Sequence, residues 1–195
     1  MGELFDTFPL LESEMLIIRK MTENDVDALS EITNNDNVYR YIPPFLYKKS
    51  RGNLLAAIRN LGGRDFEKKK MIGMGICFRD EPNRLIGLAE IFDYKKRINQ
   101  VTIGYRINES FWHRGIATET VRLLIEYLRV SMGIQTLKAY AMPENVYSEK
   151  ALLKNGFMKE PVTIQGKNWG GRESAVLNVF TYSGTQPSRD RAESL

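Results

Sequence analysis

The segment from Ile103 to Thr120 combines the residue types that bind an anion. An apolar run, Ile103 to Ile107, passes through a short loop into a segment with helical periodicity, and Arg114 and Gly115 stand at the junction. The first turn of a helix has backbone N–H groups without intrahelical partners, and the helix dipole places partial positive charge there. A glycine at that point lets a phosphate approach the backbone, so the pattern predicts a phosphate site. The alternative is that Gly115 only shapes the turn between strand and helix.

Two common phosphate motifs are missing from the sequence. A dinucleotide-binding fingerprint needs three closely spaced glycines after a strand, and a P-loop needs Gly-Lys followed by Ser or Thr. Here Gly166 and Lys167 are followed by Asn168. Both motifs are therefore excluded.

The cysteine and histidine counts exclude two kinds of chemistry. Cys77 is the one cysteine and His113 the one histidine. A single cysteine cannot form an intrachain disulfide and is typical of a reducing compartment, so we expect a cytoplasmic protein. Zinc sites built from clusters of His or Cys are excluded as well, and we expect no metal.

Length and composition predict one soluble domain. The chain has 195 residues, of which 43% are hydrophobic and 27% charged, the balance of an ordinary globular protein. We expect one folded unit over residues 1–182 and a polar tail over residues 183–195. Apolar stretches fall short of the roughly 20 residues that a membrane span requires, and the N-terminus lacks the pattern of a secretory signal.

The net charge of +4 and the pI of about 9.1 mildly favour acidic partners. The basic clusters are short and scattered, which is typical of a solvated surface. The sequence has neither an RNP-type aromatic run nor a helix with Arg and Lys along one face, so we expect no specific nucleic-acid partner.

Hydrophobic periodicity predicts alternating strands and helices in the N-terminal half. A helix capped by Thr22 follows the first strand and ends at Asn34–Asn37, and a second helix runs from about Ser50 to Leu61 before Gly62 and Gly63. Strands are predicted at Met15–Lys20, Met71–Arg79, Leu85–Asp93 and Asn99–Ile107. Short polar turns separate the last three, which indicates an antiparallel meander.

The C-terminal half begins with the longest predicted helix, Gly115 to Met132, stopped by Gly133. The strand that follows, Gln135 to Met142, is reached by this crossover helix and should be parallel to the strand before it. A helix at Val146–Lys154 and strands at Phe157–Gln165 and Glu173–Tyr182 complete the pattern. The prediction is an α/β (α+β) fold with a mixed, mostly antiparallel twisted sheet of about seven strands flanked by about four helices.

A first motif resembles the GNAT superfamily of N-acetyltransferases. Trp112-His-Arg-Gly-Ile-Ala117 is similar to the Q/R-x-x-G-x-G/A loop that binds the pyrophosphate of acetyl-CoA, with Trp112 in place of the first Gln or Arg. With Gly104-Tyr105 upstream and Ala-Thr-Glu downstream, the segment resembles the branch that contains the ribosomal-protein N-terminal acetyltransferases (RimJ/RimL-like).

A second motif supports the same branch. Asn145-Val-Tyr-Ser148, with Lys154-Asn-Gly-Phe157 closing the helix, resembles its Asn-x-x-Ser and Lys-x-Gly-Phe signature. Two motifs in the right order are more specific than either alone, and the likeness runs from about Leu16 to Tyr182.

The resemblance implies that the strands ending at Ile107 and near Met142 splay apart to hold acetyl-CoA. The backbone of Ile107 would bond the pantetheine arm, the amides from His113 to Thr118 would cradle the pyrophosphate, and Asn145 would contact the cofactor from the other wall. The implied cofactor-binding residues are Ile107, Asn108, Trp112, His113, Arg114, Gly115, Ile116, Ala117, Thr118, Asn145 and Ser148.

An acetyl acceptor must lose a proton before attack, because α-amino groups titrate near 8 and lysine near 10.4. Glu90 is the leading candidate for the base, since a carboxylate in the apolar strand Leu85–Phe92 that faced the cleft could act through a water. The alternative is that Glu90 faces solvent on the other side of the strand. The Glu that often precedes Gly-Tyr in related enzymes is replaced here by Thr102-Ile103.

The leaving thiolate needs a proton donor. Leu152 occupies the position of the family's usual Tyr, so the resemblance implies Ser148 as the substitute. The alternative is that Ser148 bonds only to backbone at its helix N-terminus. Tyr105 and Tyr147 are further candidates, with a core or cleft-wall position as the alternative for each.

The acceptor pocket should be built by the loop from Tyr39 to Lys49, the second helix and the segment Gly166–Arg172. We predict that Asn168 to Gly171 form a hairpin tip, with Trp169 either lining the pocket or packing on its neighbours. The predicted function is direct transfer of acetyl from acetyl-CoA to a primary amine in a ternary complex, first a protein N-terminus such as that of a ribosomal protein. The alternatives are a small amine, such as a polyamine or aminoglycoside, and a non-catalytic acetyl-CoA-binding module. A homodimer is compatible with the sequence.

Overall fold

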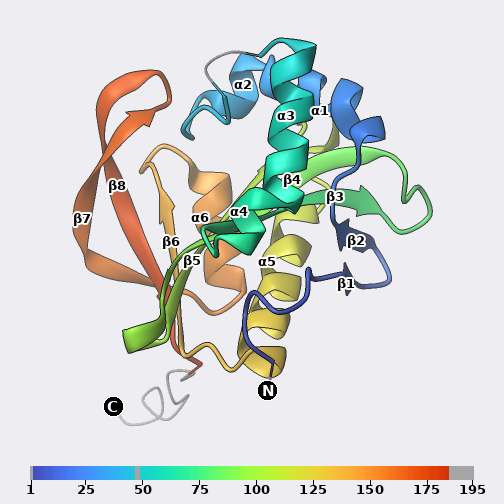
Figure 1. Cartoon of the computed structure of the whole chain (residues 1–195). Helices are drawn as coiled ribbons and strands as arrows, with labels where there is room; N and C mark the ends of the chain where they lie inside the picture. Colours follow the sequence, from blue (N-terminus) through green and yellow to red (C-terminus); the bar gives the residue numbers. More distant parts are fainter. Residues whose placement is uncertain (1, 47–48, 185–195) are drawn as a thin grey trace, which may run out of the picture.

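The computed structural model describes residues 2–46 and 49–184, so residues 185–195 of the predicted tail lie outside the described residues. Within this part of the chain the strands form one 8-stranded sheet in the order β1-β2-β3-β4-β5-β6-β8-β7 (Figure 1). The strands are β1 (Leu11–Glu12), β2 (Leu16–Arg19), β3 (Met71–Phe78), β4 (Leu85–Lys95), β5 (Gln100–Ile107), β6 (Thr136–Ala141), β7 (Met158–Trp169) and β8 (Arg172–Tyr182). The predicted fold class is confirmed, and β1 is an edge strand that the sequence pattern did not reveal.

The helices connect these strands largely where the periodicity predicted them. They are α1 (Val26–Thr33), α2 (Asp36–Tyr39), α3 (Arg51–Gly62), α4 (Arg64–Glu67), α5 (Ile116–Glu126) and α6 (Val146–Lys154), with 3₁₀ turns η1 (Glu23–Asp25), η2 (Lys96–Ile98) and η3 (Glu109–Phe111). The long helix predicted from Gly115 to Met132 ends its α-helical part at Glu126 and continues as a π-helical turn, η4 (Tyr127–Ser131). A π-helical turn widens the helix by one residue per turn, which hydrophobic spacing does not reveal.

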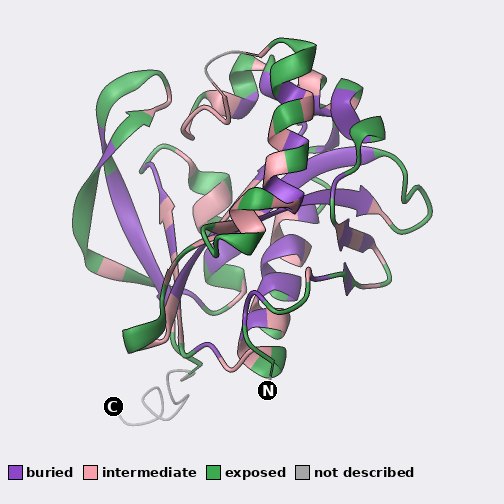
Figure 2. Ribbon diagram, viewed as in Figure 1, coloured by how far each residue is buried: buried purple, intermediate pink, exposed green. Residues whose placement is uncertain are grey.

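Two buried clusters lie on opposite faces of the sheet, and alternate residues of β3 face one or the other. Ile72, Met74 and Ile76 alternate along the strand and belong to a cluster that includes α5 residues. On the other face Gly73 lies against Leu61 of α3, where a Cβ on the glycine would approach the Leu61 Cδ2 to 2.8 Å. Helix α5 therefore covers one face, while α1 and α3 cover the other, and buried residues follow the central strands between them (Figure 2).

The meander β3–β4–β5 is antiparallel, and β6 pairs with β5 in parallel, as predicted. The parallel pairing is short: it joins Gln100, Val101 and Thr102 of β5 to Thr136, Leu137 and Lys138 of β6. Beyond it β6 stays paired with β8 as far as Ala141, opposite Asn178. The two parallel strands therefore separate in their C-terminal halves.

The β7–β8 hairpin forms the edge of the sheet opposite β1 (Figure 1). Its strands extend to Trp169 and Arg172, so the turn contains only Gly170 and Gly171, with φ +57° and +71°. Positive φ at both central residues is typical of a type I′ hairpin turn, which glycine adopts without strain. The predicted tip from Asn168 is thus shorter than expected, because Asn168 and Trp169 remain in β7.

Across residues 2–46 and 49–184, every helix is too short or too polar to cross a membrane. The same residues contain no group of three or more His, Cys, Asp or Glu side chains placed to hold a metal ion.

Candidate active site

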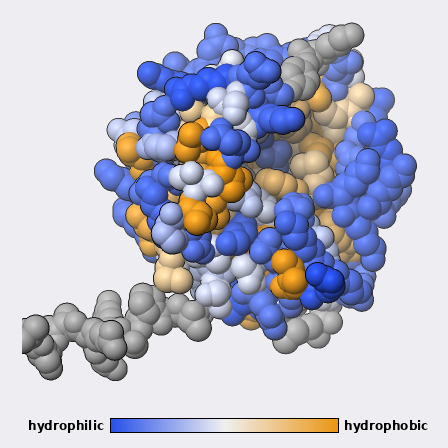
Figure 3. Space-filling model, turned by 90° about the vertical axis from the view of Figure 1, so that its left-hand side faces the viewer, coloured by the Kyte–Doolittle hydropathy of each residue, from blue (hydrophilic) through white to orange (hydrophobic). Residues whose placement is uncertain are grey.

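A cleft of about 630 Å³ opens where β5 and β6 separate. Its walls come from β4, β5 and β6, the loop before α5, the first turn of α5, the length of α6, and α2 with the segment after it. The surface on the β7–β8 side of the molecule is visibly hollowed, with apolar atoms along the hollow (Figure 3). All the predicted site residues line the cleft except Asn108 and Arg114.

The backbone of β5 faces this cleft with groups that the sheet leaves unpaired. The Asn108 N–H donates to the Ile86 carbonyl at 2.9 Å, so the neighbouring pair Gly87 and Ile107 is a non-hydrogen-bonded pair of the antiparallel ladder. The N–H and C=O of Ile107, and by alternation those of Tyr105, consequently point away from β4. Because β6 no longer pairs with β5 beyond Thr102, these groups point into the gap between the two strands.

The loop before α5 holds its shape by a side-chain bond to the same strand. The Trp112 Nε1–H donates to the Ile107 carbonyl at 2.8 Å, so this carbonyl already has one partner. His113 adopts φ +63° and Gly115 φ +78°, and a Cβ on Gly115 would meet nothing within 4 Å. The N-terminus of α5 is therefore open to the cleft, with the geometry of an anion site.

Asn108 and Arg114 have structural contacts outside the cleft. The Asn108 side chain caps η3 by accepting a hydrogen bond from the Ser110 N–H at 3.1 Å. Arg114 is exposed, donates to the Ser110 carbonyl at 3.4 Å and lies over the Phe111 ring. The His113 ring packs edge-on against Tyr147, with ring centroids 4.9 Å apart, and joins the α5 loop to α6.

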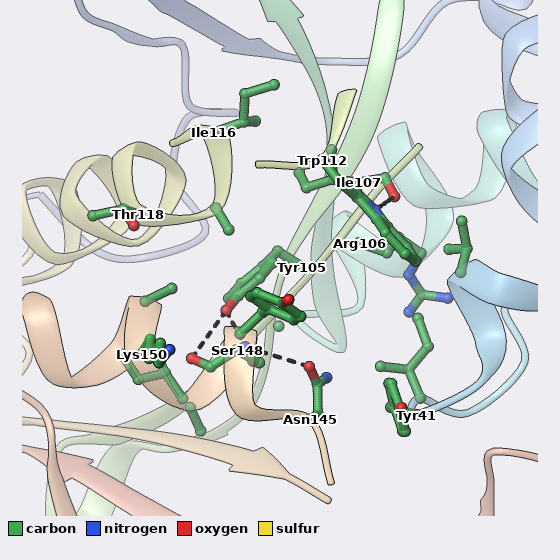
Figure 4. A pocket seen from close by; sticks show the side chains of 18 of the residues that line it. Tyr41, Tyr105, Arg106, Ile107, Trp112, Ile116, Thr118, Asn145, Ser148 and Lys150 are labelled. Atoms are coloured by element: carbon green, nitrogen blue, oxygen red, sulfur yellow. Dashed lines mark hydrogen bonds between the residues drawn. The ribbon is translucent and has the colours of Figure 1, made fainter. Parts of the chain in front are cut away.

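Helix α6 presents Ser148 to Tyr105 across the gap (Figure 4). The oxygens Ser148 Oγ and Tyr105 Oη are 2.9 Å apart, and either hydroxyl could donate. Asn145 caps the helix by accepting from the Ser148 N–H at 3.3 Å, which fixes the first turn. Ser148 thus uses its hydroxyl on another side chain, rather than only on the helix backbone.

Burial raises the pKa of the Tyr105 phenol to about 12, although its hydrogen bond with Ser148 acts in the opposite direction. A phenol with this pKa stays protonated at neutral pH, so the pair retains a transferable proton. Tyr105 was only a reserve candidate in the sequence, because its contact with α6 depends on the separation of β5 and β6.

Glu90 faces the cleft from β4, on the α1–α3 face of the sheet, and forms a buried ion pair. Its Oε2 lies 2.7 Å from Arg106 Nη2, and the two side chains are only 13% and 7% exposed. Within the described residues, the Arg106 Nε–H is buried without a hydrogen-bond partner. The sequence did not predict Arg106 at this position, since no local pattern pairs residues on two neighbouring strands.

Arg106 is further enclosed by aromatic rings. Its guanidinium lies 5.6 Å from the ring centre of Tyr39 and 5.5 Å from that of Phe45, and Nη1 donates to the Tyr39 hydroxyl at 3.4 Å. Burial opposes the charge of Arg106, but the charge of Glu90 and the contact with Tyr39 outweigh it, so the pKa of Arg106 is raised. For the Tyr39 phenol, burial is the main effect and raises the pKa, while the charge of Arg106 partly offsets it.

The far end of the cleft is lined by Tyr41, Ile42 and Pro43 after α2, and by Trp169 of β7. Of the segments predicted to build the acceptor pocket, the loop after Tyr39 and the end of β7 thus line the cleft. The second helix, α3, contributes none of the described lining residues, and residues 47–48 of the loop lie outside the described part of the chain. Trp169 both lines the cleft and packs with Tyr41 on a small cluster around Met142.

Comparison with known families gives one match over most of the chain. The family model described as an acetyltransferase (GNAT) domain matches residues 15–158. The uncharacterized N-acetyltransferase YoaA of Bacillus subtilis (strain 168) is 30% identical over 158 residues, which cover 81% of this chain and 88% of YoaA.

Two solved structures share the fold at low sequence identity. RimL, a ribosomal L7/L12 α-N-protein acetyltransferase in complex with coenzyme A, has a TM-score of 0.77 at 17% identity and covers 90% of this chain and 98% of its own. MccE, a microcin C7 self-immunity acetyltransferase in complex with acetyl-CoA and AMP, has a TM-score of 0.75 at 17% identity, covering 88% and 93%.

The buried ion pair predicts strong coupling between Glu90 and Arg106. Removing either charge leaves the other buried without its partner, so Glu90→Gln and Arg106→Gln should each cost about 3 kcal/mol of unfolding free energy. The double variant should cost much less than the sum of the two. Urea unfolding of the four proteins measures this coupling.

The exposed pair Glu81 and Arg84, whose side chains are 50% and 60% exposed, provides the control cycle. Its coupling should be below about 1 kcal/mol. Equal coupling in the two cycles would contradict a buried, mutually dependent pair.

Proposed function

Because the chain belongs to the GNAT acetyltransferase family, we propose that it transfers an acetyl group from acetyl-CoA to the α-amine at the N-terminus of a protein, such as a ribosomal protein. The chain is an N-acetyltransferase, and acetyl-CoA is the acetyl donor of the family. The observation that carries the proposal is the cleft between β5 and β6, which joins an anion-binding helix end to a separate acceptor end.

The residues present fit acetyl-CoA. The open N-terminus of α5 at Gly115 suits a pyrophosphate. The outward N–H and C=O of Tyr105 and the outward N–H of Ile107 suit the amides of a pantetheine arm. Bound there, acetyl-CoA would supply an acetyl group activated as a thioester. Asn145, already engaged as a helix cap, would hold the wall of α6 in place and leave its amide nitrogen for the cofactor.

Proton removal from the acceptor is the role we assign to Glu90. Arg106 holds its Oε2, and the other carboxylate oxygen can accept a proton from the amine through a water. The ion pair also fixes the carboxylate on the acceptor side of the sheet. Arg106 is in this account a positioning residue for Glu90.

The Ser148 hydroxyl is placed to protonate the departing sulfur. Tyr105 lies 2.9 Å behind it and, as a protonated phenol, can return a proton along the same hydrogen bond. Since Leu152 stands where the family's tyrosine is expected, Tyr105 supplies a phenol to the cleft from β5 instead of from α6.

The charges at the acceptor end favour a singly charged amine. Glu90 is paired with Arg106, and Glu144 is paired with Arg172 at 3.0 Å. Glu109, which lines the cleft, accepts hydrogen bonds from two neutral amides, Asn35 Nδ2 at 2.9 Å and Asn37 Nδ2 at 2.8 Å; these bonds lower its pKa and keep it ionised. A polycationic amine would require several free carboxylates, whereas a peptide N-terminus requires one.

An acceptor screen tests the proposal. Purified protein is given acetyl-CoA with peptides beginning in Ala or Ser, with spermidine and with kanamycin, and thiol release is measured at each acceptor concentration. We expect the highest kcat/KM with a peptide. Turnover of spermidine or kanamycin alone would establish a small-amine acetyltransferase, and binding without any turnover would establish a non-catalytic module.

The helix end can be tested by a matched pair of glycine substitutions. Gly115 and Gly156 have φ +78° and +83°, so alanine should cost either site about 1–2 kcal/mol of backbone strain. Only Gly115 faces the cleft, so Gly115→Ala should also weaken CoA binding about tenfold, while Gly156→Ala changes it less than about twofold. Titration calorimetry with CoA measures both; equal losses would remove the phosphate role from Gly115.

The Tyr105–Ser148 pair should affect turnover rather than cofactor affinity. Ser148→Ala should lower kcat by about 100-fold, the typical contribution of a general acid, with the Kd for CoA nearly unchanged. Tyr105→Phe should lower kcat as well. The control is Tyr147→Phe, which should not lower kcat, because Tyr147 is 64% exposed on the same turn of α6 as Ser148. Full activity in Ser148→Ala would exclude this hydroxyl as the donor.

A further inference from the structure

The two segments that line the acceptor end are joined to each other at the rim. The Gly170 N–H, at the tip of the β7–β8 hairpin, donates to the Ile42 carbonyl at 3.2 Å in the segment after α2. Ile42 and Trp169, on either side of this bond, both line the cleft. We call the contact between Gly170 and residues 40–42 the clasp.

The clasp is a close backbone contact. A Cβ built on Gly170 would clash with the Arg40 carbonyl oxygen, and a backbone atom cannot move aside as the end of a flexible side chain can. A Cβ on the adjacent Gly171 would meet nothing within 4 Å. Of the two turn glycines, then, Gly170 is the one that the clasp requires.

Side chains on both sides hold the clasp in place. Tyr41 and Trp169 pack together with Tyr140 on the cluster formed by Met142, Ala175 and Leu177. At the base of the turn, Arg172 pairs with Glu144 in the loop after β6. The hairpin is therefore tied both to the loop before α6 and to the segment after α2.

We propose that the clasp selects acceptors by width: an amine at the end of a narrow chain reaches the reaction centre, and an amine on a bulky ring does not. The rim would otherwise be an open groove between the two segments, and the bond from Gly170 to Ile42 closes it into a ring. The inference rests on the proposed function, which it deepens by naming slender amines as the substrate class.

Gly170→Ala and Gly171→Ala form the test pair. Both positions have positive φ, so alanine strains the turn in both variants, but only at Gly170 does it displace the Arg40 carbonyl. The acceptors are a peptide beginning in Ser, spermidine and kanamycin, and the readout is the ratio of kcat/KM for each slender amine to that for kanamycin. Melting temperature and CoA affinity are measured for each variant to confirm folding.

In the wild-type protein the kcat/KM for each slender amine should exceed the kcat/KM for kanamycin by about 100-fold or more. Gly170→Ala should reduce this ratio by about tenfold, and Gly171→Ala should leave it within about twofold. Tyr41→Ala, which removes a bulky side chain from the rim without changing the turn glycines, should reduce the ratio in the same direction if Gly170→Ala does not fold. An unchanged ratio in Gly170→Ala and in Tyr41→Ala would overturn the inference.

Amide exchange tests the clasp without any turnover. The Gly170 amide should exchange slowly in the wild-type protein because the Ile42 carbonyl accepts its hydrogen bond, and an exchange rate equal to that of an unprotected amide would overturn the inference. If spermidine is acetylated and the peptide is not, the proposed function fails, while the spermidine-to-kanamycin ratio still tests the clasp.

Discussion

The short parallel pairing of β5 with β6 is the constraint on which the rest of the site depends. Once the strands separate beyond Thr102 and Lys138, the backbone groups of Tyr105 and Ile107 have no neighbouring strand. Unpaired backbone groups inside a protein are costly unless they find partners, so the gap favours a ligand that offers amides of its own. The same separation leaves room for the N-termini of α5 and α6 at one cleft.

The two ends of this cleft differ in the kind of group they present. The donor end presents backbone N–H groups and a helix terminus, which suit an anionic, amide-containing molecule. The acceptor end presents side chains whose charges are largely paired, as in Glu90 with Arg106, together with aromatic walls. Between them Tyr105 and Ser148 bridge the gap from β5 to α6. In this account donor and acceptor meet beside the hydroxyls of Tyr105 and Ser148.

The sequence predicted what depends on local order. The boundaries of α6 follow from the Asn145 cap and the glycine after Asn155, and the meander follows from alternating apolar residues between short turns. The contacts that define the chemistry are not local: Tyr105 and Ser148 are separated by 43 residues, and no spacing rule links them. For Glu90 the sequence left two strand faces as alternatives. Its partner Arg106 lies on a neighbouring strand, and sequence patterns do not determine the register between the two strands.

The central claim is that the outward backbone groups of β5 receive the acetyl donor, and amide exchange followed by NMR with and without CoA tests it most directly. In the β4–β5 ladder the N–H groups of Gly104 and Arg106 already bond to β4, whereas those of Tyr105 and Ile107 face the gap. We predict that CoA slows exchange at Tyr105 and Ile107 by about tenfold or more and leaves Gly104 and Arg106 unchanged. Protection gained elsewhere, with no change at Tyr105 and Ile107, would contradict the account.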